Sequence, residues 1–79
     1  MSQLAYVLIM TAYGKKKDVS RKLLEFDEIK DIHEVYGQYD IIIQIKTENI
    51  NTLEDFIQNN IRSIREIQKT ETLVVSDIP

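Results

Sequence analysis

The sequence predicts an α+β fold of the ferredoxin-like kind: a four-stranded antiparallel sheet with two helices on one face, in the order βαββαβ. Two observations predict it. Strand-like and helix-like segments follow one another along the chain in this order. The two most apolar strand segments are the first and the third, and these are the central strands in this topology.

Length and composition indicate one small domain spanning residues 1–79. The chain has 79 residues, a net charge of −3 and no cysteine, so disulfides and thiolate metal sites are excluded. The negative charge argues against a general nucleic-acid surface. No apolar segment reaches the roughly 18–20 residues needed to cross a bilayer, and no basic segment precedes the first apolar run as it does in a signal peptide. We expect a cytoplasmic protein that contacts neither membrane nor DNA.

The first half of the chain contains two strands and a helix. Residues 4–11 form an apolar run rich in Tyr, Val and Ile, which predicts a strand. Residues 15–25 suit a helix, because Val19, Leu23 and Phe26 recur at spacings of four and three. Residues 29–36 form a more polar strand, as expected at the edge of a sheet.

A tight hairpin joins the second strand to the third. Gly37 and Gln38 suit a two-residue turn that begins with glycine, because the first turn position needs a positive φ. In such a turn Tyr36 faces Tyr39, and Asp40 lies opposite Val35. The third strand then runs to about residue 47 and begins with three consecutive isoleucines.

The second half of the chain predicts a helix and the last strand. Asn51 is a plausible N-cap because Glu54 follows three residues later, as in a capping box. The apolar stripe of this helix is Leu53, Phe56, Ile57, Ile61 and Ile64. The last strand covers residues 67–75, with Thr70 and Thr72 on one face and Glu71 and Leu73 on the other.

Two of the strands have no polar face, which has a consequence for assembly. A continuous apolar strand implies cover on both sides, whereas two helices cover only one face of the sheet. The bare face would exceed the apolar patch of a typical monomer, and a second copy packed sheet to sheet covers it most simply. We therefore predict an obligate homodimer of the α+β barrel kind, and from it a tetramer formed as a dimer of dimers.

Two segments carry a resemblance to a known family. The hairpin Val35-Tyr36-Gly37-Gln38-Tyr39-Asp40-Ile41 and the strand Thr70-Glu71-Thr72-Leu73-Val74-Val75 resemble the effector-binding (RAM) domain of the Lrp/AsnC transcriptional regulators. The similarity runs from Ala5 to Val75. It implies dimers of ferredoxin-like subunits, often in octameric rings, that bind amino acids in clefts between dimers.

The resemblance also implies a set of ligand-binding residues and a domain organisation. In the family, the glycine-containing hairpin and the threonine-bearing last strand line the cleft. The corresponding residues are Tyr36, Gly37, Tyr39, Asp40, Thr70 and Thr72. The family's helix-turn-helix has no counterpart in the sequence. We therefore expect a stand-alone sensing module that acts on transcription of amino acid metabolism genes, alone or by co-assembly with full-length Lrp/AsnC paralogues.

The chemistry of these residues suits a free amino acid. Asp40 can accept a charge-assisted hydrogen bond from an ammonium group. Backbone N–H groups around Gly37 can bind a carboxylate, since no side chain obstructs them. The hydroxyls of Thr70 and Thr72 can donate or accept.

Each of these residues also has a purely structural interpretation. Gly37 serves turn geometry, Asp40 can pair with a lysine or a backbone N–H, and the tyrosines can pack as a cross-strand pair. The threonines are good strand formers. The basic cluster Lys15-Lys16-Lys17 is unusual at a helix start, where cations are disfavoured, and suits a solvated surface better than an anion site.

Two other functional classes remain open. Small cofactor-independent enzymes share the dimeric barrel architecture, but the chain offers one histidine, His33, and no acid–base constellation. We predict no enzymatic activity, no cofactor and no metal. The other class is a ligand-free structural adaptor that binds a partner protein through its edge strands.

Overall fold

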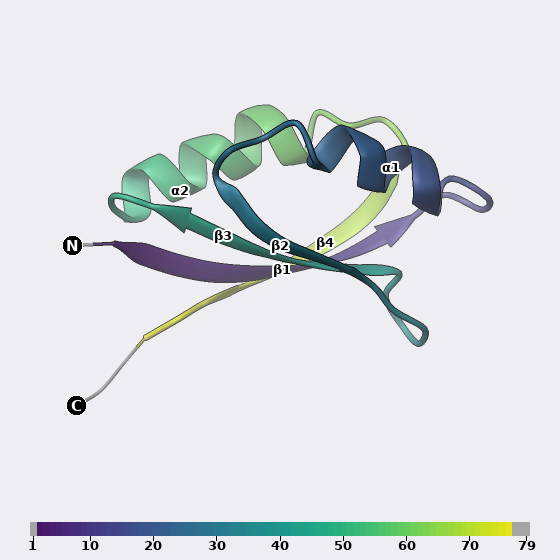
Figure 1. Cartoon of the computed structure of the whole chain (residues 1–79), viewed down its shortest axis with the longest axis horizontal. Coiled ribbons are helices and arrows are strands. Elements are labelled where there is room, and N and C mark those ends of the chain that lie inside the picture. Colours follow the sequence, from purple (N-terminus) through teal and green to yellow (C-terminus); the bar gives the residue numbers. More distant parts are fainter. Residues whose placement is uncertain (1, 77–79) are drawn as a thin grey trace.

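The computed structural model describes residues 2–76 and confirms the predicted element order and the ferredoxin-like fold (Figure 1). The sheet contains four strands in the order β2-β3-β1-β4, and each neighbouring pair is antiparallel. Their bounds are β1 Gln3–Thr11, β2 Ile29–Glu34, β3 Ile41–Thr47 and β4 Ile67–Val74. The two most apolar strands, β1 and β3, lie in the centre as predicted.

Both helices lie on the same side of the sheet (Figure 1). Helix α1 spans Lys16–Leu23, and helix α2 spans Ile50–Phe56 and continues into a wider π-helical segment, η1, at Ile57–Ile61. The N–H of Arg62 closes this wider turn by donating to the carbonyl of Ile57 at 2.9 Å. Within residues 2–76, neither helix has the length and apolarity to cross a membrane.

The start of α2 corrects one expectation. The N-cap is Asn49, not Asn51: the side chain of Asn49 accepts hydrogen bonds from the N–H of Thr52 at 2.9 Å and from its hydroxyl at 3.1 Å. The helix thus begins two residues earlier, and the N3 position of a capping box holds Thr52 instead of Glu54. The predicted apolar stripe of the second helix is confirmed for Leu53, Phe56, Ile57 and Ile61, which are buried on the helix. Ile64 is also buried, but it lies beyond the end of the helix.

The strand register assigns every residue of the sheet to one of two faces. On the helix side, Ala5, Val7 and Ile9 of β1 pair with isoleucines of β3, and all six side chains are fully buried. Val19 and Leu23 of α1 pack onto this core from above. The core that the described residues form therefore lies between this face of the sheet and the two helices.

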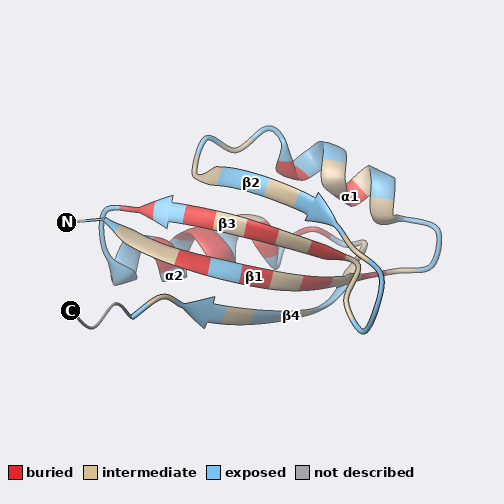
Figure 2. Cartoon of the chain, turned by 60° about the horizontal axis from the view of Figure 1, so that its bottom comes forward, coloured by how far each residue is buried: buried red, intermediate tan, exposed pale blue. Residues whose placement is uncertain are grey.

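The opposite face, here called the open face, carries apolar side chains that no other described element covers. Along β1 and β3, buried residues alternate with intermediate and exposed ones (Figure 2). Leu8 of β1 pairs with Ile42 of β3, and both are half-buried. Tyr6 is 38% exposed and Leu73 of β4 is 48% exposed, and these two residues pair with each other. Polar contact here includes the hydrogen bond from Gln44 Nε2 to the Tyr6 hydroxyl at 3.0 Å. The open face is thus the apolar surface that the strand pattern predicts.

Candidate functional site

Residues 35–40 connect β2 to β3 and form a tip that hangs below the sheet, on the side away from the helices (Figure 1). The N–H of Val35 donates to the carbonyl of Asp40 at 2.8 Å and closes the tip, so Asp40 lies opposite Val35 as predicted. Gly37 has a φ of +141°, a conformation that L side chains rarely adopt, which explains why a glycine is needed there. Space is not the reason, since a Cβ at Gly37 would meet no atom within 4 Å.

The two tyrosines of the tip point to different partners. Tyr36 is 99% exposed, and its ring centroid lies 4.7 Å from Nζ of Lys16 on α1. Tyr39 is half-buried, and its hydroxyl donates to Oε1 of Glu71 on β4 at 2.9 Å. The expected Tyr36–Tyr39 pair is therefore wrong. Both rings contact distant parts of the chain, which outcompete the neighbour across the turn.

Asp40 fastens the tip to the end of β1. Its Oδ2 accepts hydrogen bonds from the backbone N–H of Thr11 at 2.9 Å and from the Thr11 hydroxyl at 3.1 Å. Its own N–H donates to the carbonyl of Ile9 at 2.8 Å. Because Oδ2 takes both bonds, the second carboxylate oxygen, Oδ1, has no partner among the described hydrogen bonds.

The contact between Tyr39 and Glu71 changes the acidity of the phenol. The hydrogen bond to Glu71 raises the pKa of Tyr39 above its ordinary value, since ionising the phenol would break the bond and place two negative charges side by side. Glu71 pairs with Leu8 and so lies on the open face. Through this bond the tip reaches across the open face to the edge strand β4.

Thr70 and Thr72 lie on the other side of the sheet. Thr70 pairs with Ile9 and Thr72 with Val7, which places both on the helix face, and both are half-buried. The alternation of β4 is thus as predicted, with Glu71 and Leu73 facing the other way. Thr72 lines a groove of about 270 Å³ between β4 and α2. Within one chain, the structure does not bring the threonines together with the tip.

A second groove lies at the base of the tip. It has a volume of about 420 Å³, and the end of β1, the loop that follows, the tip and the start of β4 line it. Asp40 is the only one of the predicted ligand-binding residues in its lining. The groove adds Gln38, Lys16 and the fully exposed Tyr13, which reasoning from the sequence did not include in the site.

The basic cluster beside this groove divides into three different environments. Lys15 lies 3.8 Å from a carboxylate oxygen of Asp18, and Lys17 lies 2.8 Å from Oε1 of Glu34. The hydrogen bond from Lys17, together with that from Ser20, lowers the pKa of the Glu34 carboxyl. Nζ of Lys16 instead donates to the carbonyl of Val35 at 3.0 Å. The sequence analysis favoured a solvated surface for this cluster, whereas Lys16 lines the groove.

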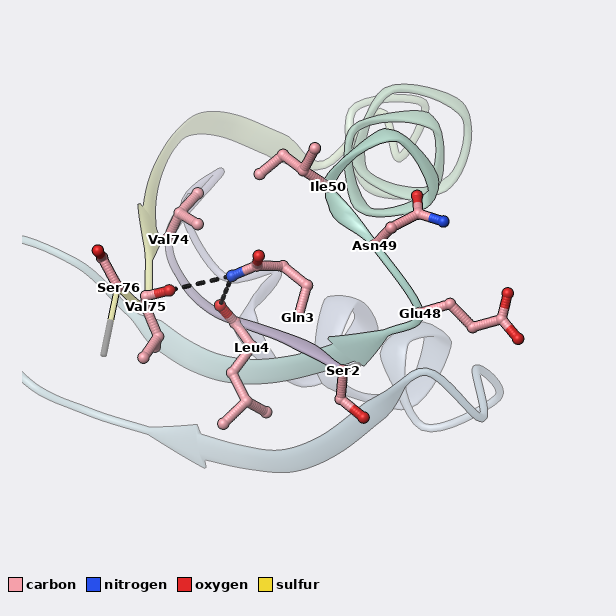
Figure 3. A pocket seen from close by; sticks show the side chains of 9 residues that line it. All are labelled: Ser2, Gln3, Leu4, Glu48, Asn49, Ile50, Val74, Val75 and Ser76. Carbon is pink, nitrogen blue, oxygen red and sulfur yellow. Dashed lines mark hydrogen bonds between the residues drawn. The ribbon is translucent and has the colours of Figure 1, made fainter. Parts of the chain in front are cut away.

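A larger groove, of about 990 Å³, lies at the opposite end of the sheet (Figure 3). It is formed by the start of β1, the loop before α2 and the end of β4, and its walls include Ile50 and Val74. Gln3 extends into it, and Nε2 of Gln3 donates to the carbonyls of Leu4 and Val75, both at 3.0 Å. None of the six predicted ligand-binding residues lines this groove.

The fold and the tip define a class of protein, namely a ferredoxin-like domain with one apolar sheet face left bare and a glycine-containing hairpin hanging over it. Comparison with known proteins identifies the family. Residues 4–79 match the family model of the Lrp/AsnC ligand binding domain. The chain belongs to this family.

Some similar proteins are longer than this chain, and others have about its length. The HTH-type transcriptional regulator FL11 of Pyrococcus furiosus is 35% identical over 72 residues, which cover 91% of this chain and 47% of FL11. The chain thus spans about half the length of this relative. The crystal structure of FFRP-DM1 is 39% identical and covers 94% of this chain and 99% of its own, with a TM-score of 0.91.

A second similar structure is a complex with a ligand. The complex of the transcriptional regulator NMB0573 from Neisseria meningitidis with L-Met has a TM-score of 0.86 and 16% identity. The match covers 95% of this chain and 50% of that protein. At this identity the likeness shows the shared fold alone.

Proposed function

We propose that the chain is an amino-acid-binding sensor module that assembles into oligomers and takes part in the transcriptional regulation of amino acid metabolism. It acts in the cytoplasm, either alone or by co-assembly with full-length Lrp/AsnC regulators. The observation that carries the proposal is the tip: a hairpin with a free carboxylate oxygen beside a groove, in a chain that belongs to a ligand-binding domain family.

The open face supports the assembly part of the proposal. Leu8, Ile42, Tyr6 and Leu73 form a contiguous apolar surface on one side of the sheet. A second copy packed on this surface removes it from water, and a two-fold axis makes the surface complementary to itself. The tip reaches over the same face, so assembly brings the tip close to residues of another subunit.

The placement of the threonines supports a site formed between subunits. Thr70 and Thr72 face the helix side, whereas Tyr39 contacts Glu71 on the open face. A ligand that touches both groups therefore takes the tip from one subunit and β4 from another. In this site Asp40 accepts from the ammonium group, and backbone N–H groups around Gly37 and the threonine hydroxyls bind the remaining polar atoms. Tyr36 and Tyr39 supply aromatic walls.

Relatives of known role agree with this proposal. FL11 is named as a transcriptional regulator, and the distant NMB0573 structure holds L-Met. The enzymatic alternative has less support in the described structure. His33, the one histidine of the chain, lies on the edge strand β2 and pairs with Ile42, so its cross-strand neighbour is apolar.

A thermal shift series with the twenty L-amino acids tests the binding. A ligand at a hundred times its Kd stabilises the native state by about 2.7 kcal/mol, which raises the Tm of a domain of this size by roughly 10 °C or more. The D-enantiomer and the N-acetyl derivative of the best amino acid serve as controls, because the first changes the arrangement of the groups around Cα and the second replaces the ammonium group by an uncharged amide. Native mass spectrometry of the same samples reports the assembly. If none of the twenty amino acids raises Tm, direct sensing is wrong.

A further inference from the structure

We infer that Lys16 is the cationic anchor for the carboxylate of the effector, so that the groove at the base of the tip holds one fixed charge of each sign for the zwitterion of an α-amino acid. The inference rests on the amino-acid-binding function proposed above. It adds to that site a residue from α1, outside both the hairpin and β4.

The first support is the position of the two charges. Lys16 is the first residue of α1, and Asp40 directly precedes β3, yet both line the groove of about 420 Å³ at the base of the tip. They do not form an ion pair with each other among the described residues. A ligand that carries an ammonium and a carboxylate can therefore engage both without displacing an existing salt bridge.

The second support is that Lys16 is held in place but not neutralised. Its Nζ donates to the carbonyl of Val35 at 3.0 Å and lies over the ring of Tyr36. An ammonium group has three donors, so the bond to Val35 leaves two for a ligand. Both contacts attract the cation without supplying a negative charge, and they fix its position before a ligand arrives.

The neighbouring lysines differ from Lys16 in their interaction partners. Lys15 and Lys17 each have a carboxylate partner, Asp18 and Glu34, and in residues 2–76 no ion pair includes Lys16. Glu34 is near enough for the charge of Lys16 to act on it, but this is the smallest of the influences that lower the pKa of Glu34, and the bond from Lys17 is the largest. Lys16 is thus the cation of the cluster whose charge is available to an anion.

The third support is the state of Asp40. Its Oδ2 is occupied by the N–H and the hydroxyl of Thr11, while Oδ1 has no described partner. The carboxylate is therefore oriented by the fold and keeps one oxygen for an ammonium group. Because Lys16 lines the same groove, the groove is matched to the two charges that all free α-amino acids share, and the side chain of the effector is left for other contacts to select.

Isothermal titration calorimetry on the full chain tests the inference. The amino acid that gives the largest thermal shift with the wild type is titrated into the wild type, Lys16→Gln and Lys17→Gln. The two variants remove the same charge from adjacent residues. Loss of one charge-assisted hydrogen bond weakens binding about 10- to 100-fold, so we expect this increase in Kd for Lys16→Gln and no change for Lys17→Gln. Lys16→Met, which keeps an unbranched side chain over Tyr36, is a second variant should Lys16→Gln fold poorly.

A second ligand separates recognition of the carboxylate from a merely structural role of Lys16. The wild type should bind the α-amide of the same amino acid more weakly than the free acid. Both Lys16 variants should bind the two ligands with similar Kd, because the group that distinguishes them is gone. If the wild type binds an amino acid but the Lys16 variants keep its Kd, or still favour the acid over the amide to the same extent, the inference is overturned while the proposed function stands. If the wild type binds none of the twenty amino acids, both are overturned.

Discussion

The hydroxyl of Tyr39 donates to Oε1 of Glu71 across 32 residues of sequence, and this bond joins the tip to the edge strand β4 on the open face. Together with the bonds from Thr11 to Asp40, it holds the tip at two places. The tip is therefore a positioned element of the fold, although it lies outside the sheet. The following predictions concern these contacts, the two faces of the sheet and the start of α2.

Glu71→Gln should lower the pKa of Tyr39 toward its ordinary value of 10.0, because the charged acceptor that disfavours the phenolate is gone. A phenol whose pKa is raised on folding adds stability below its unfolded pKa and loses that contribution as the pH rises through the folded pKa. The stability difference between wild type and variant should thus shrink above about pH 10. Phenolate absorbance, in a background where Tyr39 is the sole tyrosine, measures the shift. An unchanged titration curve would show that the bond is absent in solution.

Asp40→Ala should destabilise the fold by about 1–3 kcal/mol, since it leaves the backbone N–H of the buried Thr11 without its acceptor. Asp40→Asn keeps an acceptor oxygen in the same place and should cost less. Urea denaturation monitored by circular dichroism measures both variants. Equal losses for the two would argue that the charge of Asp40, and not its hydrogen bonds to Thr11, holds the tip.

Ile42→Lys should prevent the proposed sheet-to-sheet assembly while leaving each subunit folded, because Ile42 lies on the open face. Size-exclusion chromatography with light scattering reports the mass, and circular dichroism reports the fold. The adjacent Ile43 is fully buried on the helix side, so Ile43→Ala should instead cost about 2–5 kcal/mol of stability. An oligomer that survives Ile42→Lys would place the interface elsewhere.

Asn49→Ala should destabilise the domain by about 0.5–2 kcal/mol, as expected for the loss of an N-cap. Asn51 is exposed within the first turn of α2, so Asn51→Ala should leave stability nearly unchanged. The midpoints of urea denaturation of the two variants show which of the two asparagines caps the helix. A larger loss for Asn51→Ala would restore the helix start expected from the sequence.

Periodicity was sufficient for the features that repeat along the chain. The apolar runs of β1 and β3 identified the central strands, and alternation in β4 separated Thr70 from Glu71. These patterns repeat because side chains two residues apart point to the same face of the sheet and meet similar surroundings. The sequence therefore predicted the order of the elements, the core stripe of α2 and the existence of a bare face.

Contacts between distant segments could not be predicted in the same way. Tyr39 was expected to pack on Tyr36, but its partner is Glu71. Lys16 contacts the tip only because α1 begins beside it, an arrangement that no local pattern encodes. The prediction of the N-cap was wrong for a related reason. Asn49 and Asn51 are both good capping residues, and the path of the chain after β3 decides which of them caps α2.

The four tyrosines have a practical consequence. The chain contains no tryptophan, so tyrosines dominate its intrinsic fluorescence. Tyr6 lies on the open face, while Tyr13, Tyr36 and Tyr39 surround the tip, and none belongs to the buried core. The emission of the unlabelled protein should therefore respond to partner docking and to small molecules at the hairpin, and single Tyr→Phe replacements can separate the two signals without adding a dye.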